Sequence, residues 1–444
     1  MTGSFFGALL LVGVFLLLGH AIKALLLRRL IVPPALIGGF LALLLGPELV
    51  GGWLARAAPE GWGLGDRLIP AAIGAIWRDM PGYWITVVFA GLFLGTQIPR
   101  PREIVNQSLP NLAFGYSLAF GQYVVGVLIA ALVLVPVFDI NVMAGALIAV
   151  GFQGGHGTVA GLSDTFSDLG FAAGTDIGLG IATIGLIAAI GFGTLMSNLG
   201  RTGSGDTADV DSEEGLGPEK APSDKSFGLQ FAVLALTIGL AWLALKGLQA
   251  AEAALLPEDG FRIFRYVPLF PVAMLMGLVV QLLAERTHLA AQISRQHMES
   301  ISGLALDLLI VAALGSLSLG TLENNLGPVL ILAGAGVLYN VMLYFILAKT
   351  LFGDGWRARG LGELGQSMGT TAIGLILLKR GAPESAKFEK PFSYKQPFYE
   401  PIVGGGLVTA LALPLVNNLG PWVFLGGVVV ALLLVGVLYR LLKD

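Results

Sequence analysis

Apolar runs of about 20 residues follow one another along almost the whole of this 444-residue chain, and they limit its fold more than any other feature. A run of that length is what an α-helix needs to cross the hydrocarbon core of a bilayer. Charged residues make up only 12% of the chain, whereas soluble domains carry about 25%. The sequence therefore predicts a membrane protein whose main partner is the lipid bilayer. It excludes a soluble enzyme, a disordered protein and a nucleic-acid binder.

Eleven segments are predicted to span the membrane as helices. They are 5–27, 33–53, 83–98, 111–137, 176–199, 227–249, 266–284, 301–322, 326–351, 398–418 and 421–441. Two further apolar stretches, 140–165 and 360–379, are crowded with Gly, Ser and Thr. These two are poor candidates for uniform spanning helices, so we predict re-entrant hairpins there.

The positive charges give the expected orientation. Lys23, Arg28 and Arg29 follow the first apolar run instead of preceding it, which excludes a cleavable signal peptide and predicts an outer N-terminus. With both hairpins entering and leaving on one side, six of the 26 Lys and Arg residues lie outside and the others lie inside. The predicted location is the cytoplasmic (inner) membrane, with the C-terminus in the cytoplasm.

The only clearly hydrophilic linker, 200–226, divides the chain into two halves. Each half holds five predicted spans and one hairpin, and because five is odd the second half enters the membrane in the opposite orientation. Short matches support a duplication, since Gly-Thr-Val-Ala at 157–160 corresponds to Gly-Thr-Thr-Ala at 369–372. The predicted fold is an all-α polytopic membrane protein with two inverted-topology repeats. Its parts are a first repeat at 1–199, the cytoplasmic linker at 200–226, a second repeat at 227–419 and an additional C-terminal helix at 420–444.

Inverted repeats are common in secondary transporters, whose binding sites form near the bilayer midplane where interrupted helices meet. The two Gly-rich stretches are therefore the predicted site. Its candidate substrate- and ion-binding residues are Gln153, Gly154, Gly155, His156, Gly157 and Thr158 in the first stretch and Gln366, Ser367, Gly369, Thr370 and Thr371 in the second. Hydroxyls and unwound carbonyls suit a dehydrated cation, so sodium is predicted near Thr158 and Thr371. No cofactor is expected other than sodium as the coupling ion.

Several residues allow two interpretations. His156 can donate to an anionic substrate or titrate in a proton relay, but it can equally be a neutral buried histidine bonded within the loop. Gln122 and Asn340 occupy corresponding places in the two halves, and either contact the solute or hold helices together. The charged, aromatic stretch 387–400 is predicted to be a long inner loop, and the sequence assigns it no role.

The run Gln-Gly-Gly-His-Gly-Thr at 153–158, followed by Ala160, Ser163 and Phe166, resembles the outer-hairpin signature of the bacterial sodium/glutamate symporter family. The stretch Ile-Val-Pro-Pro-Ala-Leu-Ile-Gly-Gly at 31–39 also resembles that family's entry into its second span. This resemblance implies sodium-driven uptake by two inverted five-helix halves, a homodimer, and an elevator motion of a core past a scaffold. It places residues 154–158 in one pore loop and 369–372 in the other.

The chain departs from the family pattern in its second loop, which inserts Gln366, Ser367 and Met368 and has no proline. No Arg falls in either loop to clamp a carboxylate. The predicted function is nonetheless sodium-coupled symport of glutamate or a related small anionic or zwitterionic substrate. The alternative is an exporter or proton-coupled carrier of another organic acid or amino acid. An enzyme is not expected, because the sequence has no cysteine and no HExxH motif.

Overall fold

The computed structural model describes residues 2–28, 32–57, 68–199, 225–257, 260–353, 355–381 and 385–443. Within these ranges the chain is helical and contains no strand. Eight of the helices are long and apolar enough to cross a membrane. They are α1 (Thr2–Leu26), α5 (Pro101–Ile129) with its continuation to Phe138, α10 (Ala173–Leu199), α11 (Phe227–Leu255), α12 (Leu269–Arg286), α13 (Arg295–Gly315), α15 (Leu326–Phe352) and α21 (Pro421–Lys443). The helical content and the eight candidate spans confirm the prediction of an all-α polytopic membrane protein.

The remaining helices connect or interrupt these eight, and all of them except α4 are short. In the first part of the chain they are α2 (Pro34–Leu44), α3 (Val50–Ala57), α4 (Ala71–Gly91), the π turn η1 (Ala130–Leu134), α6 (Val135–Phe138), η2 (Val142–Ala146), α7 (Leu147–Phe152), α8 (Gly155–Gly161) and α9 (Ser163–Asp168). In the second part they are η3 (Phe264–Tyr266), η4 (Leu289–Gln292), α14 (Leu319–Asn324), α16 (Trp356–Met368), α17 (Thr371–Gly381), α18 (Ala386–Tyr394), α19 (Gln396–Tyr399) and α20 (Leu407–Leu419).

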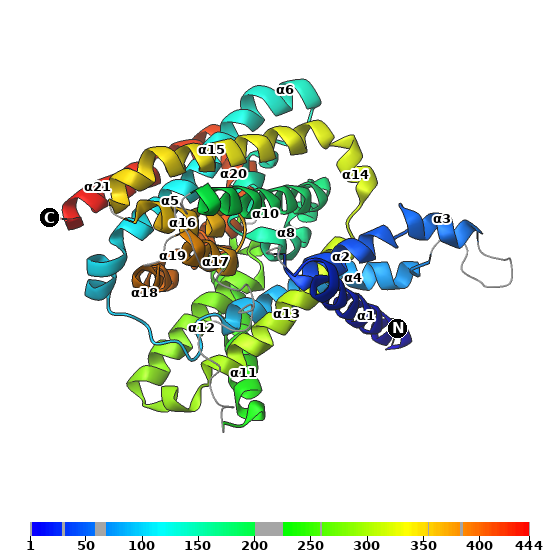
Figure 1. The fold of residues 1–444 in the computed structure, drawn as a ribbon, viewed down its shortest axis with the longest axis horizontal. Coiled ribbons are helices and arrows are strands. Elements are labelled where there is room, and N and C mark those ends of the chain that lie inside the picture. Colours follow the sequence, from blue (N-terminus) through cyan, green and yellow to red (C-terminus); the bar gives the residue numbers. More distant parts are fainter. Residues whose placement is uncertain are drawn as a thin grey trace.

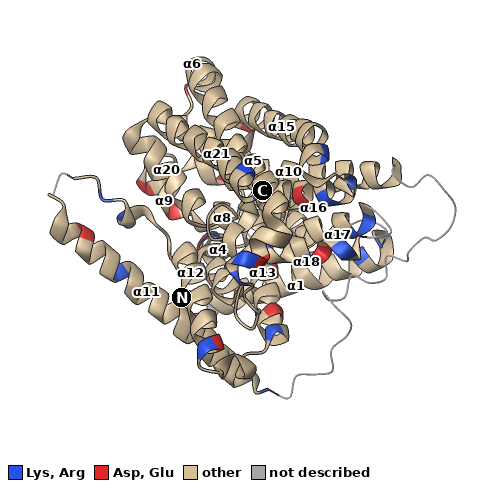
Figure 2. Cartoon of the chain, turned by 90° about the vertical axis from the view of Figure 1, so that its left-hand side faces the viewer, with Lys and Arg blue, Asp and Glu red and all other residues tan. Residues whose placement is uncertain are grey.

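The long helices carry few charges and expose large apolar side chains, as a bilayer requires. Figure 2 shows that Lys, Arg, Asp and Glu are sparse along them. Leu25 is 80% exposed and Leu338 is 69% exposed. In water such faces would be costly, whereas lipid tails solvate them as well as a protein core does.

The helices form two groups, which Figure 1 shows in different parts of the molecule. In one group α1 packs on α2, α11 packs on α12, and α4 and α13 pack on each other. In the other group α5 packs on α15 and α21, and α10 packs on α7 and α16. The short helix α8 contacts α4 and α13 of the first group as well as α10 of the second. The first interrupted stretch therefore lies between the two groups.

Glycine allows the closest helix contacts. A Cβ added to Gly19 of α1 would lie 2.3 Å from the carbonyl oxygen of Pro34, and one added to Gly38 of α2 would lie 2.6 Å from the carbonyl oxygen of Phe15. The two backbones touch directly, which is how membrane helices associate when no hydrophobic effect drives them together.

Several predicted spans have different bounds in the structure, among them 111–137, whose helix begins at Pro101, and 301–322, whose helix is α13. The segment 33–53 is divided into α2 and α3, and α4 begins at Ala71, well before the predicted start at residue 83. Arg78, Asp79 and Pro81 lie inside α4. The two charges and the proline ring give this part of the sequence the pattern of a loop, so the sequence did not predict a helix there. The segment 398–418 contains the end of α19 and is not helical again until Leu407, because Gly404, Gly405 and Gly406 interrupt it.

The stretch 387–400, predicted as a loop, is folded into α18 and α19. Phe392 and Tyr399 are each 1% exposed, so these short helices pack their aromatic side chains inside the protein. Most of the predicted linker, residues 200–224, lies outside the described residues.

Candidate functional site

Both Gly-rich stretches contain a helix that stops and restarts, and the two breaks face each other. The first break separates α7 from α8, where Gly155 adopts a φ of +66° that favours glycine. The second separates α16 from α17 at Gly369 and Thr370. A Cβ added to Gly155 would lie 3.7 Å from the carbonyl oxygen of Gly369. The predicted loops therefore meet at their tips.

A buried polar cluster lies beside the two tips, and Ser367 is at its centre. We call Gln122, Gln153, Asn340 and Ser367 the Ser367 cluster. The Ser367 hydroxyl accepts from Gln122 at 2.8 Å and from Gln153 at 2.9 Å, and it donates to Asn340 Oδ1 at 2.7 Å. Gln122 Nε2 also donates to Asn340 Oδ1 at 3.0 Å. Three of the four side chains are fully buried and Gln153 is 9% exposed.

The Ser367 cluster joins four separate elements. Gln122 comes from α5, Asn340 from α15, Gln153 from the first break and Ser367 from the last turn of α16. The structure thus brings together the two secondary candidates and one candidate from each loop. Gln122 and Asn340 bind each other, and Asn340 also donates to the Gly336 carbonyl at 2.7 Å.

His156 is turned toward α10. Its Nε2 lies 2.9 Å from the hydroxyl of Thr183, which itself donates to the carbonyl of Leu179. This arrangement matches the interpretation of a buried histidine bonded within the protein.

Thr158 is fully buried, and its hydroxyl has no hydrogen-bond partner among the described residues. It faces Gly405, where φ is +83° and an added Cβ would lie 2.6 Å from Thr158 Oγ1. A buried hydroxyl without a partner is uncommon, since such groups cost free energy when unsatisfied. Gly157, one residue earlier, packs against Ile85 of α4 instead of lining a polar space.

The second loop contacts α19. Thr371 donates its hydroxyl to Glu400 Oε1 at 2.8 Å, and Gln366 Nε2 donates to the same oxygen at 2.7 Å. Thr370 caps the start of α17 by accepting from the Ile373 amide at 3.1 Å. Thr370 and Thr371 are exposed, whereas Glu400 is 7% exposed.

A buried ion pair lies next to the second loop. Lys395, the N-cap residue of α19, forms an ion pair with Glu363 of α16, and both side chains are almost completely buried. Glu363 also accepts from Asn111 of α5 at 2.8 Å, and Arg359 donates to the same asparagine. Tyr399 donates to Gln153 Oε1 at 2.7 Å and so connects α19 to the Ser367 cluster.

Lys395, Tyr399 and Glu400 were not among the residues predicted from the sequence. They fall in a stretch whose charges and prolines gave it the pattern of a solvated loop. The available signal was the presence of ionisable residues between two apolar segments, because ionisable groups at membrane depth are expensive and usually functional.

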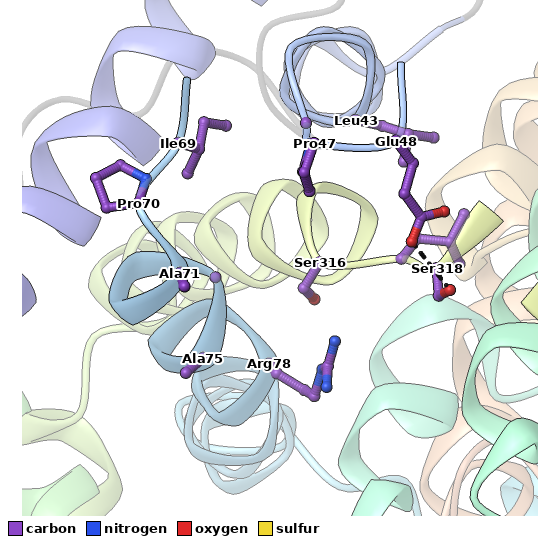
Figure 3. Close-up of a pocket in the computed structure, with 14 residues that line it drawn as sticks. Leu43, Pro47, Glu48, Ile69, Pro70, Ala71, Ala75, Arg78, Ser316 and Ser318 are labelled. Atoms are coloured by element: carbon purple, nitrogen blue, oxygen red, sulfur yellow. Dashed lines mark hydrogen bonds between the residues drawn. The ribbon is translucent and has the colours of Figure 1, made fainter. Parts of the chain in front are cut away.

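Two adjoining cavities lie on the other side of the first break. One, of about 280 Å³, lies between α2, α4 and the end of α13. Figure 3 shows Arg78 on one side of this cavity and Glu48, which accepts from Ser318, on another. The second cavity, of about 370 Å³, shares Arg78, Ser316 and Ser318 and extends to Ala160 and Ser163. The second cavity therefore reaches the end of α8, the helix that follows the first break.

The amino-acid sequence matches the model of one known protein family. The family described as sodium/glutamate symporter matches residues 87–379, which is more than half of the chain and contains both breaks. A search of curated proteins found no match. The match ends in α17, before Lys395 and Glu400. This chain is a member of the sodium/glutamate symporter family.

Proposed function

We propose that the protein is a secondary active transporter that carries glutamate, or a related small amino acid or carboxylate, across the cytoplasmic membrane together with sodium. Family membership supports sodium as the coupling ion and glutamate as the substrate class. The observation that carries the proposal is the meeting of two interrupted helices at the buried Ser367 cluster. Interrupted helices that meet at a polar centre are the usual substrate and ion sites of such carriers.

The proposed architecture is a pair of inverted repeats, each with one re-entrant loop. Reciprocal packing supports it, because α2 of the first half packs on α13 of the second, while α12 of the second packs on α4 of the first. Polar backbone at membrane depth is tolerated only where protein buries it or water reaches it. Residues 150–153 and 156–160 around the first break and 361–369 before the second are buried and meet that condition, while Thr370 and Thr371 after the second break are exposed.

The proposed motion is of the elevator type. The group formed by α5, α7, α10, α15 and α16 carries the Ser367 cluster and both breaks. The group formed by α1, α2, α4, α11, α12 and α13 is the proposed scaffold, and α8 lies between the two. On the basis of the family resemblance we propose a homodimer. The positive charges support an orientation with the N-terminus outside and the C-terminus in the cytoplasm.

We propose one sodium position at Thr158, whose unpartnered hydroxyl faces the backbone at Gly405. Replacing Thr158 by alanine removes this hydroxyl and is expected to raise the half-saturating sodium concentration about tenfold, which corresponds to about 1.4 kcal/mol of binding free energy. Thr158→Ser is expected to keep the wild-type value. Thr237→Ala is the matched control, because that hydroxyl only bonds the Val233 carbonyl within α11. Equal sodium affinity in Thr158→Ala and Thr237→Ala would contradict this position.

The proposed function is tested by uptake into proteoliposomes. Radiolabelled glutamate, aspartate, neutral amino acids and dicarboxylates are offered with sodium outside, and in parallel with choline in its place. We expect sodium-dependent uptake of glutamate or a close relative. Uptake that is the same in choline would refute sodium coupling.

A proton-coupled carrier of another organic acid or amino acid, or an exporter, is the second candidate. Glu400 favours proton coupling specifically, because a buried carboxylate beside the loop is the type of group that proton carriers use. Uptake driven by a pH gradient in sodium-free buffer would select this alternative.

A further inference from the structure

The two adjoining cavities meet at Arg78, which lines both of them. Arg78 is exposed and lies in the first half of α4, and Figure 3 shows its side chain extending from that helix into the space beside Ser316. The second cavity, of about 370 Å³, also has Asp176 of α10 in its wall. We call this second cavity the Arg78 cavity.

The guanidinium of Arg78 makes no hydrogen bond and no salt bridge with any residue that the structure describes. Asp176 acts on it electrostatically, although the two groups form no salt bridge. Arginine presents five N–H donors in a planar fork that matches the geometry of a carboxylate. The wall of the cavity therefore offers a cation that can bind a carboxylate through two hydrogen bonds at once.

Asp176 supplies the opposite charge in the same wall. Its Oδ1 accepts from the backbone amide of Ser318 at 3.0 Å, and the side chain of Thr321 lies close enough to interact with the carboxylate. Both of these partners are neutral, so they leave the negative charge of Asp176 in place. An ammonium group, which has three donors and a positive charge, complements such a carboxylate.

Hydroxyl groups occupy much of the remaining wall. The residues that carry them are Ser163, Ser167, Thr175, Ser316, Ser318 and Thr321. The Thr175 hydroxyl is buried and has no hydrogen-bond partner among the described residues. Hydroxyls both donate and accept, so they suit the polar groups of a small solute. The volume of the Arg78 cavity also falls within the range of about 300–1,000 Å³ that small-molecule sites occupy.

The Arg78 cavity lies between the two groups of helices. Arg78 of α4 and Ala313 of α13 come from the proposed scaffold, whereas Asp176 comes from α10, in the group proposed to move. A ligand that binds both charges therefore favours the arrangement in which the two groups lie this close. The Ser367 cluster is different, because all of its residues belong to the moving group or to the first break.

We infer that the Arg78 cavity is a binding site for a free α-amino acid, separate from the Ser367 cluster. Arg78 pairs with the α-carboxylate, Asp176 pairs with the α-ammonium, and the side chain of the ligand lies among the hydroxyls. Because the site contacts both helix groups, it captures the substrate before transport and does not carry it. The inference rests on the proposed function and makes its substrate class specific, since a carboxylate without an amine leaves Asp176 unpaired.

The chain contains no cysteine, so one introduced thiol can report on the cavity. Ser167→Cys places it in the wall at an exposed position, and its alkylation by N-ethylmaleimide is timed in detergent with choline in place of sodium. Glutamate at about ten times its dissociation constant is expected to slow alkylation about tenfold, because about a tenth of the sites then remain free. Glutarate, which is glutamate without its amine, is expected to protect far less at the same concentration.

The matched control is Ser300→Cys, the same exchange at an exposed position of α13 outside the cavity wall. Its alkylation is expected to proceed at one rate with and without glutamate. This control shows whether glutamate changes the reactivity of the reagent or of exposed thiols in general.

Variants of the two charged residues, each combined with Ser167→Cys, identify the ligand-binding groups. Arg78→Gln is expected to abolish protection, and Arg78→Lys is expected to keep part of it, because lysine retains the charge without the fork. Asp176→Asn keeps an oxygen for the Ser318 amide and is expected to make glutamate protect no better than glutarate. In proteoliposomes, Arg78→Gln without the cysteine is expected to raise the half-saturating glutamate concentration about tenfold and to keep the maximal rate.

The outcomes separate this inference from the proposed function. Equal alkylation of Ser167→Cys with and without glutamate, together with sodium-dependent uptake by the wild type, would overturn the Arg78 cavity and leave the proposed function standing. Protection that survives Arg78→Gln, or that glutarate gives as well as glutamate, would also overturn the site as described. Sodium-independent uptake, with protection that Arg78→Gln abolishes, would overturn the proposed function and support the cavity as an amino-acid site.

Discussion

Replacing Lys395 by methionine is expected to destabilise the folded protein by about 3–5 kcal/mol. The Lys395 ammonium and the Glu363 carboxylate form an ion pair whose side chains are 0% and 1% exposed. Removal of the cation leaves the anion buried with Asn111 as its direct hydrogen-bond donor. Desolvation of an uncompensated charge is costly, whereas removing both charges is far less so. Equilibrium unfolding in mixed detergent measures the change.

Two comparisons show whether the ion pair is the cause. The double variant Glu363→Gln, Lys395→Met is expected to recover most of the lost stability, because it leaves no lone charge. Lys379→Met removes a partly exposed partner that lies 3.5 Å from Glu389, and it is expected to cost less than about 1 kcal/mol. A double variant as unstable as Lys395→Met would show that packing of the lysine chain, and not its charge, stabilises this region.

Replacing Ser367 by alanine is expected to have the second large effect, on both stability and transport. The hydroxyl of this fully buried residue accepts from Gln122 and Gln153 and donates to Asn340. Without it, polar groups of three other elements lose a partner where no water replaces it, at a cost of about 1–3 kcal/mol. Because the same bonds fix the relative position of the two breaks, uptake is expected to fall by about tenfold or more, which corresponds to about 1.4 kcal/mol.

Ser300→Ala is the matched control for this prediction. Ser300 is exposed on α13, and its hydroxyl donates only to the Gln296 carbonyl one turn earlier. Unfolding and initial uptake rates are compared for the two variants. If Ser367→Ala transports as fast as Ser300→Ala, the Ser367 cluster does not position the site.

The sequence predicted the interrupted helices well because their cause is local. Gly155 has a positive φ that other residues avoid, and clusters of Gly, Ser and Thr mark both breaks directly in the sequence. Internal comparison of the halves also gave Gln122 and Asn340 corresponding positions, and in the structure Gln122 Nε2 donates to Asn340 Oδ1 at 3.0 Å. Apolar length likewise located most of the long helices.

The part that sequence reasoning missed depends on contacts between distant residues. Residues 387–400 contain charges, prolines and aromatics, a pattern typical of a loop. They fold because Lys395 binds Glu363, 32 residues away, and because Tyr399 packs against Gly115 of α5 and binds Gln153. Local propensity contains no information on those partners. The same reason explains α4, whose Arg78 borders a cavity formed with α13.

Sodium-coupled transport by this protein is tested most directly by glutamate accumulation in proteoliposomes at zero membrane potential with a tenfold inward sodium gradient. Each coupled sodium ion then contributes about 1.4 kcal/mol, enough to raise the internal glutamate concentration about tenfold above the external one. We predict accumulation that reaches or exceeds this ratio and collapses when an ionophore dissipates the sodium gradient. Glutamate that only equilibrates, with the same final ratio in sodium and in choline, would contradict sodium-coupled transport by this protein.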